Sequence, residues 1–269
     1  MSAELISAVI PAYNAEAHID AALRSTLAQV KPGIVDVEIL VVDDGSTDGT
    51  LAKTDAVAAQ YPGKVQIIRQ PQNLGPAAAR NAGLRRATGT FICFLDADDQ
   101  YIPGFFAGGL EFLQQNPRVA AIITGVEFVN CHREIHPLQY RAIVDSIPSN
   151  VLLRTSVAHL LGGFPEDVTF RGRAASEDFC FKLALIEEFQ VFRAKQKCLR
   201  YLVRPGSHFD FFLDRTEVID GRLVFKEVTP EEASGAMAAA RRAYRSAFRQ
   251  RVEATALCKR LSSSPPKNA

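Results

Sequence analysis

The sequence predicts an α/β protein with a Rossmann-like, mostly parallel central sheet and helices on both faces. Short and almost wholly apolar runs alternate with helical patterns through the first 124 residues, as expected of strands buried between two helical layers. Polar clusters follow three of these runs directly. The composition, 47% apolar and 23% charged, is ordinary for a globular protein of this length.

The elements of the first half follow from these runs in order. Strands are expected at 5–10, 37–42, 65–68, 91–95 and 120–124. Helices are expected at 17–29, 49–60, 76–86 and 103–115, two of them opened by a proline at the first helical position. Residues 125–150 form a mixed region with strand-like pieces, without a clear period.

The second half is less regular. We expect a short strand leading into a helix over 151–160, ended by Gly162 and Gly163, then a helix at 176–188 and strands within 191–203. Residues 229–260 form a helical extension, with Thr229 as N-cap and Pro230 at the first helical position. Residues 262–269 have the composition of a disordered tail.

Charge and cysteine content exclude several classes of protein. A net charge of +1 gives no general affinity for nucleic acid. Five widely spaced cysteines predict neither a disulfide framework nor a zinc site and fit a reducing compartment. No leader pattern and no apolar run of about 18 residues is present, so we expect a cytoplasmic protein.

The segment 241–260 is strongly basic, with seven Lys or Arg residues against one acid, Glu253. Tyr244, Phe248 and Val252 recur every four residues and form an apolar stripe beside this cationic face. Three partners are open for the stripe. It could contact an anionic membrane surface peripherally, pack on the rest of the chain, or form a homodimer interface.

Three carboxylates, Asp96, Asp98 and Asp99, directly follow the apolar run 91–95. Uncompensated carboxylates at the end of a buried strand are costly. A divalent cation with hard oxygen ligands, Mg²⁺ or Mn²⁺, removes this cost and binds phosphate oxygens in turn. The alternative is that the acids only cap the strand end and the next helix.

Two further polar clusters, 11–14 and 43–46, follow the first and second predicted strands. The carboxyl ends of parallel strands meet at one edge of a sheet, and ligands bind there. Asp44 stands before Gly45, which permits close approach of a ligand to the backbone. Its carboxylate can accept a hydrogen bond from a ring imide N–H such as that of uracil. For Asp48 a turn or helix-capping role is favoured.

These segments resemble family 2 glycosyltransferases in order and spacing. The resemblance is dense over residues 5–105 and returns at 162–166, 176–178 and 201–207. It rests on the segments 8–14, 41–50, 73–75, 79–81 and 94–99. It implies a GT-A fold and transfer of a sugar from a nucleotide donor with inversion. It also implies a catalytic domain over 1–225, with a nucleotide-sugar half at 1–124 and an acceptor half at 125–225, and a C-terminal extension at 226–269.

The resemblance also implies roles for matching residues. Pro11, Ala12 and Tyr13 would line the base pocket, and Asp44 would bind the edge of uracil or another base. Arg80 would lie near the nucleotide, with a solvated helix face as the alternative.

For the acidic segment the resemblance implies that Asp96 contacts the ribose or a metal-bound water. Asp98 would ligate Mn²⁺ or Mg²⁺, and Asp99 would be structural. Asp178 is the expected catalytic base, with Glu177 as the second candidate. The alternative is that Ser176 caps a helix whose dipole both acids complement.

The chain departs from the family's pattern near residue 204. Many members have a histidine near the metal or diphosphate, whereas this chain has Arg204. An arginine can pair with phosphate but cannot ligate a metal. His208, four positions later, is a candidate replacement ligand.

The sequence therefore predicts a metal-dependent inverting glycosyltransferase of glycan or cell-surface polysaccharide synthesis. The expected donor is a nucleotide sugar, with UDP preferred. The expected acceptor is a glycan or a lipid-linked molecule, and peripheral contact with the inner membrane surface is one of the alternatives for the basic segment 241–260. One rival is a non-catalytic nucleotide-sugar-binding protein. A sugar-phosphate nucleotidyltransferase fits less well, because Pro11 to Asn14 is not a glycine-rich basic phosphate loop.

Overall fold

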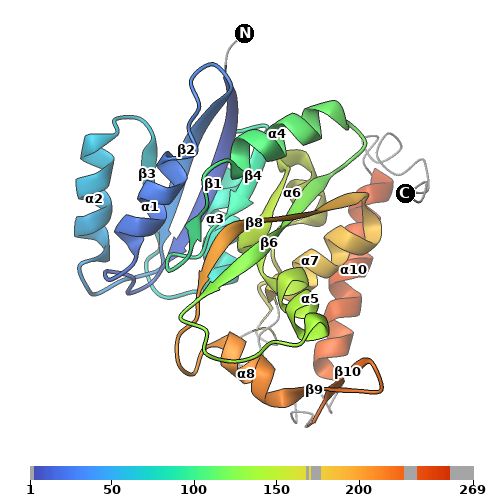
Figure 1. Ribbon diagram of the computed structural model, residues 1–269. Helices are drawn as coiled ribbons and strands as arrows, with labels where there is room; N and C mark the ends of the chain where they lie inside the picture. Colours follow the sequence, from blue (N-terminus) through green and yellow to red (C-terminus); the bar gives the residue numbers. More distant parts are fainter. Residues whose placement is uncertain (1–2, 168–169, 171–176, 227–234, 255–269) are drawn as a thin grey trace.

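An eight-stranded sheet with the order β3-β2-β1-β4-β7-β6-β8-β5 forms the centre of the protein (Figure 1). The computed structural model describes residues 3–167, 170, 177–226 and 235–254. The strands are β1 (Glu4–Ala12), β2 (Val35–Asp43), β3 (Val65–Arg69), β4 (Phe91–Phe94), β5 (Gln100–Tyr101), β6 (Ala121–Val129), β7 (Val151–Arg154) and β8 (Val191–Leu202). Strands β1–β4 pair in parallel, as do β6 and β8, whereas β7 and β5 pair antiparallel with their neighbours.

Helices cover both faces of this sheet, as the sequence predicts (Figure 1). They are α1 (Ile19–Leu27), α2 (Thr50–Gln60), α3 (Pro76–Arg86), α4 (Phe105–Gln115), α5 (Pro137–Ser146), α6 (Thr155–Leu161), α7 (Glu177–Glu188), α8 (His208–Arg215) and α10 (Ala236–Ala254). Helices α1 and α4 pack on one face, and α3 and α6 pack on the other. A Cβ at Gly83 of α3 would lie 2.3 Å from the Val9 side chain, so only glycine lets α3 approach β1 this closely.

The parallel strands end in register at one edge. Ala12 of β1 pairs with Asp43 of β2, and Val9 of β1 pairs with Phe94 of β4. The polar residues that follow these three strands therefore meet at the same edge, as predicted.

Three aromatic rings connect the carboxyl end of β4 to helix α7. The Phe94 ring lies edge-on to the Phe164 ring at 4.9 Å, and Phe164 stacks on Phe181 of α7 at 4.2 Å. All three side chains are buried. This cluster fixes α7 relative to the carboxyl end of β4.

The structure differs from the sequence interpretation between residues 125 and 150. The region holds the end of β6, helix α5 and a 3₁₀ turn, η1 (Pro148–Asn150). Helix α5 begins with a capping box, in which His136 Nδ1 accepts from the Leu138 N–H and Gln139 Oε1 accepts from the His136 N–H. This start signal is present in the sequence, but the apolar period behind it is too short to stand out.

The predicted strands within 191–203 are one long strand, β8 (Val191–Leu202), which pairs with β6 with register shifts near Gly125. The sequence interpretation assigned no elements to 204–225. The structure has α8 there, followed by a hairpin of β9 (Thr216–Ile219) and β10 (Arg222–Phe225). The two-residue strand β5 was also not predicted.

The C-terminal helix α10 packs on α6 and α7 (Figure 1). Phe248 is buried, Tyr244 donates its hydroxyl to the Gly163 carbonyl, and Arg251 donates to the Leu160 and Leu161 carbonyls. Of the three partners left open for the stripe, the structure supports packing on the rest of the chain. The predicted caps Thr229 and Pro230 and residues 255–269 lie outside the described residues.

Two acids of α7 pair with the basic face of α10. Arg245 lies 2.9 Å from Glu187, and Arg249 lies 3.3 Å from Glu188. Much of the cationic face is thus matched within the protein. Within the described residues, no helix combines the length and apolarity that crossing a bilayer requires.

Candidate active site

A cavity of about 780 Å³ opens at the carboxyl ends of β1, β2 and β4. Its lining contains every residue that the sequence predicted for the site. These are Pro11, Ala12, Tyr13, Asp44, Arg80, Asp96, Asp98, Glu177, Asp178, Arg204 and His208. The structure thus brings the predicted residues together; their individual roles stay predictions.

The loops after β1 and β2 are tied to each other at the cavity mouth. Asn14, with φ of 47°, accepts from the Thr47 N–H through its side-chain oxygen and donates its own N–H to the Ser46 hydroxyl. This leaves the Tyr13 side chain half exposed over the cavity. A half-exposed ring at the mouth can stack on a planar ligand group.

Asp44 is buried and holds the loop that leads into α3. Its carboxylate accepts from the backbone N–H groups of Leu74 and Gly75, at 2.7 and 2.8 Å, and from the Gln70 amide at 3.0 Å. Asp44 therefore shapes the cavity wall as well as lining it. A contact between its carboxylate and a base would add to these bonds.

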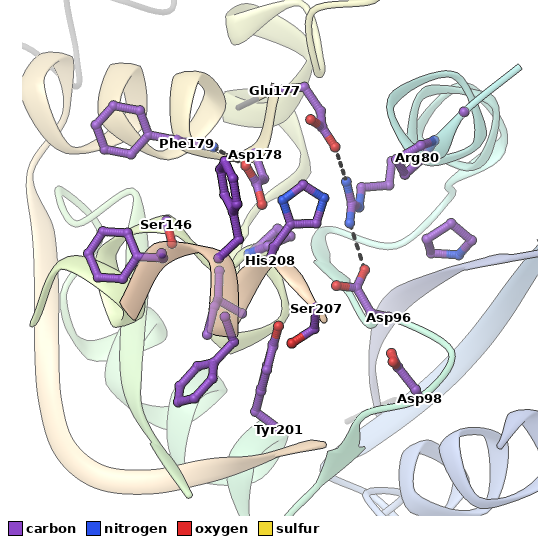
Figure 2. Close-up of a pocket in the computed structure, with 18 of the residues that line it drawn as sticks. Arg80, Asp96, Asp98, Ser146, Glu177, Asp178, Phe179, Tyr201, Ser207 and His208 are labelled. Atoms are coloured by element: carbon purple, nitrogen blue, oxygen red, sulfur yellow. Dashed lines mark hydrogen bonds and ion pairs between the residues drawn. The ribbon is translucent and has the colours of Figure 1, made fainter. Parts of the chain in front are cut away.

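Arg80 of α3 lies between two carboxylates (Figure 2). Its Nη2 lies 2.6 Å from Asp96 Oδ1, and its Nη1 lies 3.3 Å from Glu177 Oε1. The guanidinium also covers the Phe164 ring at 5.2 Å, and the side chain is buried. The solvated-face alternative for Arg80 is wrong, because Arg80 joins the end of β4 to the start of α7.

Asn81, the next residue, fixes the ring beneath Arg80. Its side-chain amide donates to the Phe164 carbonyl and accepts from the Phe164 N–H, at 2.8 and 2.7 Å. Gly163 has φ of +73°, and a Cβ there would lie 2.2 Å from the Asn81 amide oxygen. The 79–81 and 162–166 segments therefore act together to place the Arg80 support.

Asp98 pairs with Arg204, whose Nη2 lies 2.5 Å from Asp98 Oδ2. Burial raises the pKa of Asp98, the charge of Asp96 raises it further, and Arg204 lowers it. The Asp98 carboxylate therefore needs a cation beside it, and in this structure the guanidinium of Arg204 fills that role.

Asp99 is buried in the protein and does not line the cavity. It is 1% exposed, and one carboxylate oxygen accepts from the Leu202 N–H at 3.1 Å. Burial raises its pKa well above the ordinary value, and the charges of Asp96 and Asp98 act in the same direction. This supports the structural role predicted for Asp99, which fixes the loop to the end of β8.

Glu177 and Asp178 occupy the first turn of α7. Glu177 pairs with Arg80, whereas Asp178 accepts from the Phe179 N–H at 2.6 Å and faces the cavity (Figure 2). Burial raises the pKa of Asp178 to about 7, and the charge of Glu177 contributes in the same direction. A carboxylate with a pKa near neutrality suits a general base. The proposed cap Ser176 lies outside the described residues.

His208 begins α8 and lines the cavity, and in Figure 2 its ring lies between Asp178 and Arg80. No group of three or more His, Cys, Asp or Glu side chains that could hold a metal occurs in the part of the chain that the structure describes. A metal held at Asp98, with or without His208, would take its remaining ligands from elsewhere.

The other half of the cavity contains residues that the sequence did not single out. Helix α8 and the β9–β10 hairpin supply aromatic and aliphatic side chains, helix α5 supplies Ile143, Ile147 follows α5, and α10 supplies Arg241. The side chains from α8 and the hairpin are Phe209, Phe211, Phe212, Arg215, Leu223 and Phe225. The Arg241 guanidinium lies over the Phe179 ring at 5.1 Å. The only sequence signal for this wall is the spacing of Phe209, Phe212 and Leu213 on one helical face.

Comparison with known proteins identifies relatives of the first half above all. The family model "Glycosyl transferase family 2" matches residues 7–164. An uncharacterized glycosyltransferase of Haemophilus influenzae is 37% identical over 116 residues, 43% of this chain and 45% of its own length. A putative teichuronic acid biosynthesis glycosyltransferase of Bacillus subtilis, TuaG, is 35% identical over 41% of this chain and 42% of its own length. The chain thus spans less than half the length of these curated relatives.

Solved structures share the fold over a longer stretch. TarS 1–349 of S. aureus, in a crystal structure with UDP, has a TM-score of 0.62 at 23% identity, covering 76% of this chain and 61% of that chain. The mannosyltransferase PcManGT of Pyrobaculum calidifontis, in complex with GDP-Man and Mn²⁺, has a TM-score of 0.57 at 20% identity, covering 94% of this chain and 75% of that chain. At these identities the likeness is one of fold.

Proposed function

The chain belongs to glycosyl transferase family 2 and has the GT-A fold, and from this we propose that it is an inverting glycosyltransferase with a nucleotide-sugar donor. Our preferred donor is a uridine-diphosphate sugar. The observation that carries the proposal is the joint placement of Asp178 and the Asp96–Asp98 segment in one cavity, joined through Arg80. One ion-pair network, from Asp96 through Arg80 to Glu177, thereby holds the proposed leaving-group site next to the helix that carries the proposed base.

The donor half of the cavity suits a nucleoside diphosphate. Tyr13 supplies an exposed ring and Asp44 a buried carboxylate at the base end. Asp96 is held by Arg80 at the end of β4, where a ribose or a bound water can accept or donate hydrogen bonds. TarS and PcManGT were solved with UDP and GDP-Man respectively, which supports a diphosphate nucleotide as the ligand class.

The residues fit a divalent cation that arrives with the diphosphate. Five carboxyl groups, those of Asp96, Asp98, Asp99, Glu177 and Asp178, share the region with the guanidiniums of Arg80 and Arg204. A diphosphate adds further negative charge, and Mg²⁺-type sites use one or two carboxylates together with substrate phosphates. Asp98, with His208 as a second donor, would hold Mn²⁺ or Mg²⁺, which when bound would neutralise the charge of the leaving diphosphate.

In the transfer step Asp178 acts as the base. The acceptor hydroxyl oxygen attacks the anomeric carbon from the face opposite the diphosphate, and Asp178 takes the hydroxyl proton. The bond from the anomeric carbon to the diphosphate oxygen breaks, and its electron pair leaves with the nucleoside diphosphate. The new glycosidic bond therefore has inverted configuration. Glu177 stays paired with Arg80 and keeps the Asp178 helix in register with Asp96.

The half of the cavity formed by α5, α8 and the β9–β10 hairpin would receive the acceptor. Its aromatic side chains can stack on sugar rings or contact an apolar aglycone, so a glycan and a lipid-linked acceptor both suit it. The Bacillus subtilis relatives are named for teichuronic and minor teichoic acid biosynthesis. We therefore propose a role in cell-surface polysaccharide synthesis, on the cytoplasmic side of the membrane.

A thermal-shift panel of nucleotide sugars, each with and without Mn²⁺, tests the donor. We expect a uridine-diphosphate sugar with Mn²⁺ to raise the melting temperature most, and Asp98→Ala to lose most of the metal-dependent part. An equal metal-dependent shift in Asp98→Ala would contradict the metal assignment. Binding without release of nucleoside diphosphate, with any acceptor, would favour the non-catalytic nucleotide-sugar-binding protein.

A further inference from the structure

The ion pair between Arg204 and Asp98 places a guanidinium at the oxygen that the proposed function gives to the metal. Building on that function, we propose that Arg204 is an exchangeable counterion. It pairs with Asp98 in the donor-free enzyme and moves to the donor's diphosphate when Asp98 takes the metal. Metal and nucleotide would consequently bind with positive cooperativity.

The two partners differ in how tightly the protein holds them. The Asp98 side chain is 18% exposed, whereas that of Arg204 is 58% exposed. Arg204 follows the end of β8, and Gly206, with φ of +73°, has no atom within 4 Å of its Cβ position. The carboxylate is therefore fixed while the guanidinium can swing out on its side chain.

Electrostatics favours a change of partner for both Asp98 and Arg204 when metal and diphosphate bind. Asp96 already has Arg80 as its counterion, whereas Arg204 is the one cation that the structure pairs with Asp98 among the described residues. Losing Arg204 without a replacement would leave a mostly buried carboxylate beside another one, which is costly. A guanidinium released toward a diphosphate gains a bidentate partner of matching geometry.

The exchange predicts reciprocal coupling. A metal at Asp98 frees Arg204 for phosphate, and phosphate drawn to Arg204 frees Asp98 for the metal. Each ligand must then raise the affinity for the other by the same factor. We expect a factor of about tenfold or more, within the 5–150-fold range that site-to-site coupling commonly spans.

A different use of Arg204 makes the opposite prediction. If the guanidinium permanently replaced the metal at the diphosphate, Mn²⁺ would leave the affinity for UDP unchanged. The measurement below separates the two, because it determines the coupling itself and needs no acceptor or turnover.

The experiment uses the full chain and two ligands, UDP and Mn²⁺. Calorimetry gives the Kd of UDP in chelator and in saturating Mn²⁺, and electron paramagnetic resonance of free Mn²⁺ gives the Kd of the metal with and without UDP. In the wild type we expect each ligand to tighten the other by about tenfold or more. In Arg204→Gln we expect tighter Mn²⁺ binding without UDP, weaker UDP binding without Mn²⁺, and coupling several-fold smaller than in the wild type, because only the direct contact between metal and phosphate then links the two ligands.

Two further variants complete the test. Arg200→Gln is the matched control, since Arg200 lies on β8 four residues before Arg204, is 50% exposed, pairs loosely with Glu127 at 3.8 Å and does not line the cavity. Its coupling should equal that of the wild type. Arg204→His restores the family's residue type, and we expect it to bind Mn²⁺ more tightly than the wild type without UDP.

The outcomes separate this proposal from the proposed function. UDP binding that Mn²⁺ does not change in the wild type, or coupling in Arg204→Gln equal to the wild type, overturns the exchange while the donor site stands. A wild type that binds no nucleotide with or without metal overturns the donor site and the exchange with it. A wild-type circular dichroism spectrum and a cooperative unfolding transition in each ligand-free variant, even at a lower melting temperature for Arg204→Gln, show that the differences do not come from misfolding.

Discussion

The proton-accepting role of Asp178 predicts how the reaction rate depends on pH. Burial raises its pKa from the ordinary 3.8 to about 7. Because a base works only when deprotonated, kcat/KM should fall tenfold for each pH unit below about 7 and level off above it. Asp178→Asn, which cannot take the proton, should lower kcat by roughly 10²- to 10⁴-fold while UDP binding persists.

Neighbouring charges should move this pH midpoint in opposite directions. Glu177 raises the pKa of Asp178 and Arg80 lowers it. Glu177→Gln should therefore shift the midpoint to lower pH, and Arg80→Gln to higher pH, each by about 1 unit or more. The assay is release of nucleoside diphosphate across pH 5–9, with the midpoint rather than the rate as the readout.

The same pKa predicts a stability effect whose sign can be worked out. The folded state binds the Asp178 proton more tightly than the unfolded state, so stability is full below about pH 4 and falls as pH rises toward 7. The difference between 3.8 and about 7 corresponds to at most about 4 kcal/mol. Asp178→Asn should thus raise the melting temperature at pH 8 although it slows transfer strongly. Two results would refute this reasoning. One is that the pH midpoints of Glu177→Gln and Arg80→Gln shift in the same direction or not at all. The other is that Asp178→Asn lowers the melting temperature at pH 8.

Three substitutions test how the site is held. Lys182 donates to the carbonyls of Val144 and Ile147 and to the Asn150 amide oxygen at 2.7–2.8 Å. Lys182→Met removes these bonds, and only the Val144 carbonyl keeps a second donor among the described residues, the Asn150 amide. The substitution should lower the free energy of unfolding by about 3 kcal/mol, a melting-temperature loss of several degrees by calorimetry. Gly163→Ala should lower the free energy of unfolding by about 2 kcal/mol or more and weaken UDP binding, since the new Cβ would meet the Asn81 side chain. Gly221→Ala is the control, because Gly221 also has a positive φ but open space around it. It should destabilise the protein less. Phe248→Ala should cost about 3 kcal/mol and, by loosening α10 from α7, raise susceptibility to proteolysis; an unchanged melting temperature would contradict the packing of α10.

The donor half of the site was predictable because its signals are local. Each strand is a continuous apolar run, and the polar residues that end it must meet their neighbours once the strands are parallel. Asp96, Asp98 and Asp44 could therefore be placed together from the sequence. The sequence also predicted a structural role for Asp99, in contrast to the ligand-binding roles of these three residues. The burial of Asp99 and its hydrogen bond from the Leu202 N–H support that prediction.

The remainder of the site depends on contacts between distant segments. Arg80 gave no local sign that it would be buried between Asp96 and Glu177, which lie 16 and 97 residues away. Helix α8 and the β9–β10 hairpin are short, so their apolar spacing is a weak signal in the sequence. Their positions depend on packing against the rest of the cavity wall. The Arg204–Asp98 pair joins two loops, and only the fold brings them into contact.

The configuration of the first product tests the central claim most directly. An α-linked uridine-diphosphate sugar is incubated with the wild-type chain and Mn²⁺, with water as the acceptor, and the anomeric protons are followed by NMR before mutarotation. We predict release of UDP and first appearance of the β-anomer, with both lost in Asp178→Asn. First appearance of the α-anomer, or undiminished release by Asp178→Asn, would contradict a single displacement in which Asp178 is the base.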